Sequence, residues 1–327
     1  MRRNQSEITE FILLGFGELH HLRIFLFIVF LVIYILAMAT NILTILLIVT
    51  DHQLHTPMYF FLGNLSCLET FYSSTILPRF LASLLTGDIT ISVQGCITQL
   101  YFFAFLIGTE CCLLSVMSYD RYLAICKPLH YAGVMNGRLC IQLSVGSWFN
   151  SIVFASVFLG MILKIQFCGP NEIDHFYCDS LPLVKLSCSH LSLVKHVTII
   201  VSFIFTFPPF LLTLTSYVYI IATILRIPST TGRQKAFSTC SSHLIVVCIF
   251  YGALIIVYLI PKTEAMRDLN KIFSVLYTVL PPIANPLIYS LKNKDVKEAL
   301  KKAARKVLEW QFLNQRFKVW QSLTFYK

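Results

Sequence analysis

The sequence predicts an all-α fold, a bundle of seven membrane-spanning helices with a short amphipathic helix after the seventh span. Of the 327 residues, 56% are apolar and only 13% are charged, about half the charged share of soluble domains. A soluble fold has too little interior to bury so many apolar side chains, which excludes a cytosolic enzyme, a disordered regulator and a fibrous protein. The apolar residues form seven long runs, without the ~10-residue polar–apolar alternation of membrane barrel strands.

Each apolar run is long enough to cross a bilayer as a helix, because about 20 residues at ~1.5 Å each span a ~30 Å hydrocarbon core. The predicted spans are Ile24–Thr50, Met58–Leu85, Ile97–Cys126, Leu139–Leu163, Val197–Ile227, Leu244–Ile260 and Ile272–Leu291. They divide the chain into an extracellular amino-terminal segment (1–23), a seven-helix domain (24–291) and a cytosolic amphipathic helix and tail (292–327). The apolar cluster Phe11–Leu14 is too short for a signal peptide, so we expect the first span to insert as an uncleaved anchor.

The charge distribution predicts the orientation. With the amino terminus outside, the cytosolic segments hold 16 Lys and Arg against 5 Asp and Glu, a net charge of +11. The rest of the chain holds 10 bases and 11 acids, a net charge of −1. The positive-inside rule therefore favours a multi-pass plasma-membrane protein with its amino terminus extracellular and its carboxyl terminus cytosolic. The overall charge of +10 is then an orientation signal, and no nucleic-acid partner is expected.

Two further features concern the extracellular side. Asn4 begins a glycosylation sequon there, whereas the sequon at Asn64 lies within the second span and is expected to stay unmodified. Four cysteines also fall outside, namely Cys96, Cys168, Cys178 and Cys188. Four cysteines allow three pairings, which their spacing leaves open. The other seven are expected to be small buried hydrophobic residues.

Two acids lie deep within predicted spans. Glu69 is about twelve residues into the second span and Glu110 about thirteen into the third, which places both near the bilayer midplane. Charges at this depth are costly and are candidates for function. Either the pair forms a buried cation or proton site, or one or both acids are protonated and simply hydrogen-bonded. The residues alone leave both interpretations open.

Three polar motifs lie at the ends of spans. Asp120-Arg121-Tyr122 closes the third span, where an acid–base pair alone would indicate interfacial anchoring. Pro286 near the end of the seventh span lacks an N–H and frees a carbonyl, which we expect Asn285 or water to satisfy. His243 begins the sixth span without a metal-ligand set around it, so we expect it to pack at the interface.

The segment after the seventh span predicts an amphipathic helix on the anionic inner leaflet, because apolar residues recur at helical spacing among Lys and Arg. The apolar face consists of Val296, Ala299, Leu300, Ala303, Val307 and Leu308. Membrane lipids are therefore expected partners of this segment.

The motifs, taken in order, resemble those of olfactory (odorant) receptors of the tetrapod-type class, which are rhodopsin-like (class A) G-protein-coupled receptors. The resemblance is carried by Leu54–Leu62 (LHTPMYFFL), Met117–Tyr131 (MSYDRYLAICKPLHY), Ser216-Tyr217, Lys235–Leu244 (KAFSTCSSHL), Phe250–Gly252, Pro281–Ser290 (PPIANPLIYS) and Lys292–Lys297. It implies a receptor without catalytic activity. Its expected partners are a small-molecule odorant and a heterotrimeric G protein of the stimulatory, olfactory type, which raises cAMP.

The resemblance also implies roles for individual residues. Cys96 is expected to bond Cys178, and Cys168 to bond Cys188. The residues expected to switch the receptor towards its G protein are Asp120, Arg121, Tyr122, Tyr217, Asn285, Pro286 and Tyr289. Glu69 and Glu110 occupy the positions of the family's sodium or proton site, although aspartate is commoner at the first; no other cofactor or metal is expected. Thr40-Asn41 also departs from the usual Gly-Asn of the first span.

The same resemblance places a ligand pocket in the outer halves of the third, fifth, sixth and seventh spans. The matching positions are Phe103, Ala104, Ile107, Gly108, Val201, Ser202, Phe205, Tyr251, Leu254, Ile255, Tyr258 and Thr278. This set is mostly apolar with a few hydroxyls, which suits a volatile, weakly polar compound. Lys262 is the cation near the outer end of the sixth span that could meet an anionic ligand.

An alternative is a membrane enzyme or ion carrier built on Glu69 and Glu110. An enzyme would need a cluster of His and Asp at one depth, and a carrier would show repeated halves with broken helices. The sequence contains neither, nor a G-x-S-x-G, a phosphate-binding glycine loop or an H-E-x-x-H motif. The receptor interpretation is therefore favoured.

Overall fold

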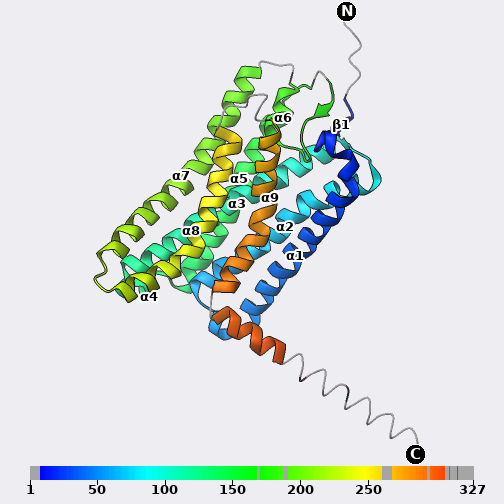
Figure 1. Ribbon diagram of the computed structural model, residues 1–327. Helices are drawn as coiled ribbons and strands as arrows, with labels where there is room; N and C mark the ends of the chain where they lie inside the picture. Colours follow the sequence, from blue (N-terminus) through cyan, green and yellow to red (C-terminus); the bar gives the residue numbers. More distant parts are fainter. Residues whose placement is uncertain are drawn as a thin grey trace, which may run out of the picture.

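Seven long helices dominate the computed structural model, which describes residues 8–167, 170–187, 191–259, 267–292, 295–305, 309 and 315 (Figure 1). These helices are α1 (Arg23–Thr50), α2 (Pro57–Thr86), α3 (Val93–Cys126), α5 (Gly137–Ile162), α7 (Leu191–Arg226), α8 (Thr230–Leu259) and α9 (Arg267–Lys292). Each covers one predicted apolar run to within one residue at its carboxyl end, so the predicted seven-helix bundle is confirmed. The largest difference is at α8, which begins at Thr230 rather than Leu244 because polar residues extend the helix beyond the apolar run.

Apolarity alone marks fewer than seven of these helices as membrane spans. In the described residues, α1, α3, α5 and Phe203–Arg226 of α7 are long and apolar enough, and α8 makes a fifth if its two segments, bent by 50°, count as one span. The other two long helices carry polar side chains that face other helices: Glu69 of α2 and Asn285 of α9 are both buried. They span as part of the bundle because its interior, not lipid, surrounds these groups.

The short elements lie at the two ends of the bundle (Figure 1). At one end are the 3-10 helix η1 (Gly17–Leu22), the helix α6 (Ser180–Lys185) and the strands β1 (Glu10–Leu13), β2 (Thr90–Ser92) and β3 (Glu172–Ile173), and we call this the sheet end. At the other are the 3-10 helix η2 (His52–Leu54), the helix α4 (Pro128–Val134) and the helical residues 295–305, and we call this the α4 end.

Local sequence signals set several helix boundaries. The Ser92 hydroxyl accepts a hydrogen bond from the Gly95 N–H at 3.0 Å at the start of α3, and Asn136 Oδ1 accepts one from the Leu139 N–H at 3.0 Å at the start of α5. α2 and α4 each begin with a proline, whose missing N–H costs nothing in a first turn. Gly87 ends α2 in the left-handed conformation, with φ +81°.

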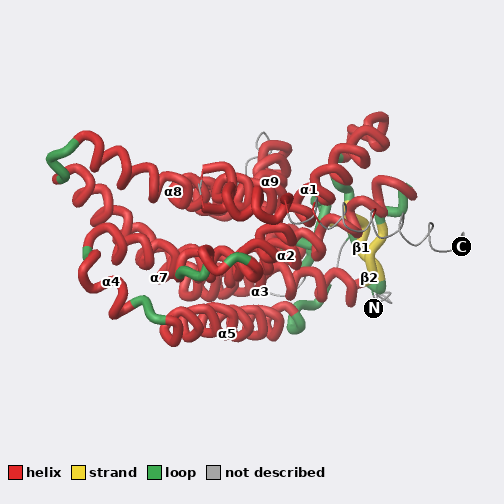
Figure 2. Tube along the Cα trace, turned by 90° about the horizontal axis from the view of Figure 1, so that it is seen from below, coloured by secondary structure: helices red, strands yellow, loops and turns green. Residues whose placement is uncertain are grey.

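α3 is the central helix of the bundle. In its most apolar stretch 78% is buried, against 17% in that of α1. It packs against α2, α5, α7 and α8, and Figure 2 shows it between α5 on one side and α8 on the other. Side chains of α3 therefore reach most of the interior, which explains why several candidate site residues lie on this helix.

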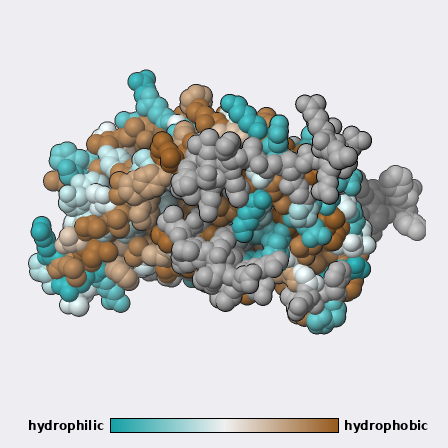
Figure 3. Space-filling model, turned by 90° about the horizontal axis from the view of Figure 1, so that it is seen from above, coloured by the Kyte–Doolittle hydropathy of each residue, from teal (hydrophilic) through white to brown (hydrophobic). Residues whose placement is uncertain are grey.

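The amino-terminal segment closes the sheet end as a strand, which the sequence did not predict. β1 pairs antiparallel with β2 and parallel with β3, in the order β2-β1-β3. Phe11 of the apolar cluster is fully buried and meets Phe167 edge-to-face at 5.3 Å. Over the described part of this end, hydrophilic and hydrophobic side chains are interspersed (Figure 3). The apolar cluster Phe11–Leu14 therefore contributes a β-strand whose side chains pack into the core at the sheet end.

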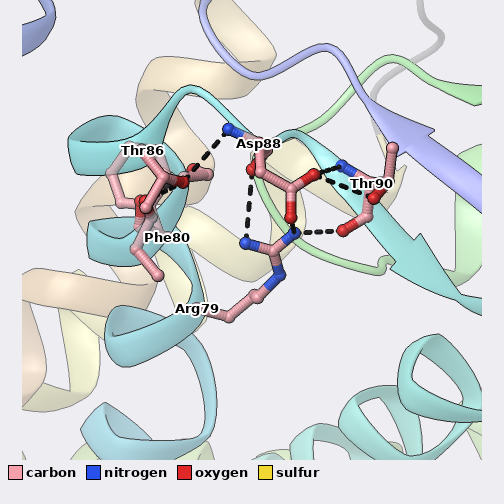
Figure 4. A network of polar contacts seen from close by, with 7 residues as sticks. Arg79, Phe80, Thr86, Asp88 and Thr90 are labelled. Carbon is pink, nitrogen blue, oxygen red and sulfur yellow. Dashed lines mark hydrogen bonds and ion pairs between the residues drawn. The ribbon is translucent and has the colours of Figure 1, made fainter.

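A polar network fixes the turn between α2 and β2 (Figure 4). Asp88 Oδ1 accepts hydrogen bonds from the N–H and the hydroxyl of Thr90 at 2.9 and 2.8 Å. Arg79 donates to the Asp88 and Thr90 carbonyls and forms an ion pair with Asp88 at 3.4 Å. The hydrogen bonds from Thr90, with Arg79 nearby, hold the pKa of Asp88 below its usual value. The network orients β2, on which β1 pairs.

The helix of residues 295–305 packs partly on the bundle rather than wholly on lipid. Val296 and Ala299 are buried in the core at the α4 end, while Leu300 is 43% exposed. Lys302 Nζ donates to Asp51 Oδ2 at 3.3 Å and to Gln53 Oε1 at 2.8 Å. The expectation that one whole apolar face lies on the membrane is thus wrong for Val296 and Ala299, because the protein itself covers them; Val307 and Leu308 lie outside the described residues.

Replacing Asp88 should loosen β2 in a pH-dependent way. Asp88→Asn should raise the exchange rate of the Thr90 amide about fivefold at pH 7, since it weakens the bond that this N–H donates. Ionised Asp88 stabilises the fold fully above its unfolded pKa of about 3.9, and this contribution is lost as pH falls through the lower folded pKa. Hydrogen–deuterium exchange should therefore show the two proteins converging below pH 4. Glu172→Gln on the exposed edge of β3 is the control, and a difference that persists at low pH would contradict the assignment.

Candidate functional site

A missing backbone N–H organises the buried polar centre of the bundle. Pro286 cannot donate to the carbonyl of Pro282 four residues earlier. Instead Asn41 of α1 donates its Nδ2 to the Pro282 oxygen at 2.7 Å, and also to the Ala37 oxygen at 2.9 Å. The expectation that Asn285 or water would satisfy this carbonyl is wrong, because a side chain from α1, distant in the sequence, reaches it first.

Asn285 is instead the partner of one candidate acid. Its Nδ2 donates to Glu69 Oε1 at 2.5 Å, and both side chains are buried. Glu110, from α3, is fully buried and lies close enough to Glu69 to interact with it electrostatically. The structure thus brings together the two acids and the Asn285 that the sequence singled out separately.

This polar centre has more acceptors than donors. In the described residues no hydrogen-bond partner is present for Glu69 Oε2, Glu110 Oε1 and Oε2, Asn41 Oδ1, Asn285 Oδ1 and the Tyr72 hydroxyl. Two carboxyl groups in an apolar interior cannot both stay ionised without compensation. A proton or a hard cation, which prefers oxygen ligands, fits such a donor set. The described residues contain no group of three or more His, Cys, Asp and Glu that could hold a metal ion.

An ion pair closes α3 at the α4 end. Arg121 donates from Nε and Nη2 to Asp120 Oδ2 at 2.9 and 2.5 Å, and Asp120 is fully buried. The Tyr131 hydroxyl of α4 donates to the other oxygen, Oδ1, at 2.8 Å. Burial and the neighbouring Asp120 carboxylate raise the pKa of Tyr131, so its phenol stays protonated and donates. Asp120 therefore holds Arg121 on one oxygen and α4 on the other.

A second polar contact at this end joins α7 to α8. The Tyr217 hydroxyl lies 2.6 Å from His243 Nδ1, and the two rings stack at 5.8 Å. His243 is fully buried, so the expectation that it packs at the interface is wrong. His243 lies in the polar stretch of α8 that precedes the apolar run, and its ring packs against Tyr217 of α7. Tyr122, in turn, packs against Tyr219 of α7 at 5.9 Å, while the Tyr289 side chain lies outside the described residues.

The residues of the expected ligand pocket fall into two groups. Phe103 packs against the rings of Tyr72, Tyr177 and Tyr277. Ala104, Val201 and Phe205 instead belong to a core cluster with Phe154 of α5. A side chain added at Gly108 would meet Ser151 and Phe154 at 3.3 Å, so this glycine also faces α5. The pocket positions implied by the resemblance thus include side chains that contact α5 as well as residues that face the centre of the bundle.

The other expected pocket residues differ in exposure and bonding. Tyr251 donates its hydroxyl to the Cys111 carbonyl at 3.3 Å, and Thr278 donates to the Ser274 carbonyl at 2.7 Å within its own helix. Ile107 and Leu254 are half-buried between two core clusters, whereas Ile255 is 40% exposed. The side chains of Ser202 and Tyr258, and all of Lys262, lie outside the described residues.

The loop between α5 and α7 is fastened over the sheet end of the bundle. A disulfide joins Cys96 of α3 to Cys178, as the resemblance implied for this pair. Gln99, one turn along α3, accepts from the Cys178 N–H and donates to the Thr75 carbonyl of α2, both at 3.0 Å. Cys168 and Cys188 lie outside the described residues.

Two contacts between this loop and α9 were missed by sequence reasoning. Lys271 forms a partly buried ion pair with Asp174 at 2.5 Å, and the hydroxyls of Tyr177 and Tyr277 are hydrogen-bonded. Lys271 directly precedes the predicted seventh span, and Tyr277 is next to the expected pocket residue Thr278. The sequence therefore offered one signal for this contact, a polar residue at the edge of an apolar run. That signal did not indicate which residue Lys271 would bind.

Comparisons with known proteins agree with these features. A model of the olfactory receptor family matches residues 30–306. The chain is 48% identical to mouse (Mus musculus) Olfactory receptor 6Z7 over 91% of its length and 95% of that protein. It is 47% identical to human (Homo sapiens) Olfactory receptor 11L1 over 93% of its length and 94% of that protein. A crystal structure of squid rhodopsin shares the fold, with a TM-score of 0.66 at 17% identity over 88% of this chain and 87% of that one.

Replacing Asn41, whose side chain donates to the Pro282 carbonyl of α9, should destabilise the bundle. Asn41→Ala leaves the Pro282 carbonyl buried without its donor, so we expect the free energy of unfolding to fall by about 1–3 kcal/mol. The melting temperature of the detergent-solubilised protein measures this. Thr40→Ala is a matched control, because the Thr40 hydroxyl bonds only within α1. Equal melting temperatures for both variants would mean that the Asn41 bond does not hold α1 to α9.

Proposed function

Because the chain belongs to the olfactory receptor family, we propose that it binds small, mostly apolar volatile ligands in the outer half of the bundle and activates a stimulatory, olfactory-type G protein, raising cAMP. Members of this family are multi-pass membrane receptors that bind small molecules and G proteins, and they are not enzymes. For this chain we thus propose the class of ligand, the position of the pocket, the type of G protein, and ligand binding as the step that precedes G-protein activation. Binding would shift a two-state equilibrium rather than drive a chemical step.

The observation that carries the proposal is the closed arrangement of Arg121 at the α4 end. Asp120 holds the guanidinium, and the nearby Tyr217–His243 contact holds α7 to α8. An agonist that binds better to an open conformation pulls the equilibrium away from these contacts. Arg121 and Tyr217 would then turn towards the G protein, and the proline-broken turn at Asn285, Pro286 and Tyr289 would carry the rearrangement through α9.

The proposed orientation places the sheet end outside the cell and the α4 end in the cytosol. Two observations support it: the Cys96–Cys178 disulfide at the sheet end suits an oxidising compartment, and the bases of residues 295–305 suit the anionic inner leaflet. Asn4 would then carry the glycan. The antiparallel bridge between Phe167 and Ser187, each next to one of the remaining outer cysteines, supports a Cys168–Cys188 disulfide.

We place a sodium ion or a proton at Glu69 and Glu110. The support is the set of buried oxygens of Glu69, Glu110, Asn41 and Asn285 that lack partners among the described residues, because they would supply ligands to a hard cation or share a proton. Bound there, either species would compensate the buried negative charge between α2 and α3. Asn285 would position the Glu69 carboxyl through its bond to Oε1.

The ligand class follows from the chemistry of the pocket residues. Phe103, Ile107, Phe205 and Leu254 supply apolar surface, and no Asp, Glu or Arg is among the twelve positions. Such a pocket suits a weakly polar compound with one hydrogen-bonding group. Screening an odorant panel with a cAMP reporter in cells tests the proposal, and the absence of any ligand-dependent response from a receptor that reaches the surface would count against it.

Arg121→Ala should abolish the response to any odorant found in this way. We expect at least a tenfold loss of the ligand-dependent cAMP signal, since the variant lacks the guanidinium that the proposed switch releases towards the G protein. An amino-terminal epitope on intact cells measures the surface level and also tests the orientation. Arg138→Ala, an exposed arginine at the start of α5, should respond like the unmodified receptor. Activity surviving in the Arg121 variant would contradict the mechanism.

Tyr258→Phe should weaken polar agonists more than hydrocarbons. Loss of one hydrogen bond should raise the half-maximal concentration for an alcohol or ketone about three- to tenfold and leave a hydrocarbon of similar shape unchanged. Dose–response curves for matched pairs of odorants measure the difference. An equal shift for both members of a pair would exclude a hydrogen-bonding role for this hydroxyl.

A further inference from the structure

A groove on the outer surface of the bundle lies between α3, α5 and α7. Its volume is about 440 Å³, within the range of small-molecule sites. It is lined by Ser115, Asn150, Ile204, Phe205, Pro208, Pro209 and Leu212. Ile204 is 58% and Leu212 42% exposed, so the groove opens sideways to lipid. Only Phe205 also belongs to the pocket proposed inside the bundle.

Asn150 is a polar side chain among apolar ones on this surface. It lies at the middle of α5 and is exposed, while the surrounding exposed residues of the helix, such as Phe149, Val153 and Val157, are apolar. Its Nδ2 donates to Cys112 Sγ at 3.5 Å, and sulfur is a weak acceptor. No partner for its Oδ1 is present in the part of the chain that the structure describes. An amide oxygen facing hydrocarbon costs free energy unless a donor reaches it.

Two residues that border the same groove have backbone carbonyls without their usual helical donors. Pro208 and Pro209 have no N–H, so they cannot donate to the carbonyls of Ile204 and Phe205 four residues earlier. All four residues border the groove. The Ser115 hydroxyl does not supply the missing donor, because it already donates to the Cys112 carbonyl at 2.8 Å.

The groove therefore combines apolar walls with a surplus of acceptors. A ligand that fits has an apolar body and a donor; ketones, aldehydes and ethers lack the donor, and an ammonium group is too costly to bring to this depth. We propose that this groove is a second ligand site that binds an uncharged apolar alcohol from the lipid phase, with its hydroxyl donating to Asn150 Oδ1. The site does not depend on the proposed receptor function, because its occupancy is measurable without signalling.

The test uses the full-length protein in phosphatidylcholine vesicles and a decanol that carries a photoreactive diazirine in its chain. After irradiation, mass spectrometry locates the label. We expect it on peptides containing Asn150 and residues 204–212, displaced by excess decanol but not by decyl methyl ether, which lacks the donor. Asn150→Leu should reduce this labelling about fivefold, and Asn150→Gln, which keeps the amide, should restore part of it. Val153→Leu, on the same lipid-facing side of α5, is the matched control.

Several outcomes would overturn the site. Equal displacement by decanol and its methyl ether, or label spread evenly over lipid-facing residues of α1 and α5, would mean that bulk lipid fills the groove. Equal losses in Asn150→Leu and Val153→Leu would mean that the amide plays no part. Should Asn150→Leu fail to fold, the competition between alcohol and ether on the unmodified protein still decides between the two results.

Discussion

Hydrocarbon offers no hydrogen-bond partners, so each polar group inside the bilayer must be satisfied by the protein or by a ligand. The broken turn of α9 shows how far this requirement reaches. Because Pro286 has no N–H, the Pro282 carbonyl takes its bond from Asn41 and so fastens α1 to α9. Asn285 is then available to bond Glu69 and fastens α9 to α2. The missing N–H of Pro286 is thus linked to the side-chain contacts that join α9 to α1 and α2.

The two ends of the bundle are held by bonds of different kinds. At the sheet end a disulfide, a three-stranded sheet and the partly buried Lys271–Asp174 pair fix the loops over the helices. At the α4 end the contacts of Asp120, Arg121, Tyr217 and His243 are all non-covalent and exchangeable. The proposed signal, from a ligand near the sheet end to a G protein at the α4 end, would use this asymmetry, since the α4 end can change partners while the sheet end holds its shape.

Sequence reasoning predicted the long helices well because a ~20-residue apolar run is a local property. It missed β1, since a strand of four residues (Glu10–Leu13) is recognisable only by its pairing with residues about 80 and 160 positions away. Asn41 and Pro282 are 241 residues apart, so their bond was equally invisible. The resemblance implied which positions of α3 are candidates for the pocket, but not which helix each one meets; Gly108 faces Ser151 and Phe154 of α5.

The same constraint has opposite results at the two proline sites. At Pro286 the freed carbonyl lies in the interior, where Asn41 from a neighbouring helix reaches it. At Pro208 and Pro209 the break lies on a face of α7 turned towards lipid, and the neighbouring amide of Asn150 adds an acceptor of its own while its donor is directed at Cys112. A carbonyl freed in the interior can take a hydrogen bond from another helix of the fold. On this lipid-facing surface, the donor must come from a molecule that arrives through the membrane. A hydroxyl group is the smallest uncharged donor that can provide this hydrogen bond.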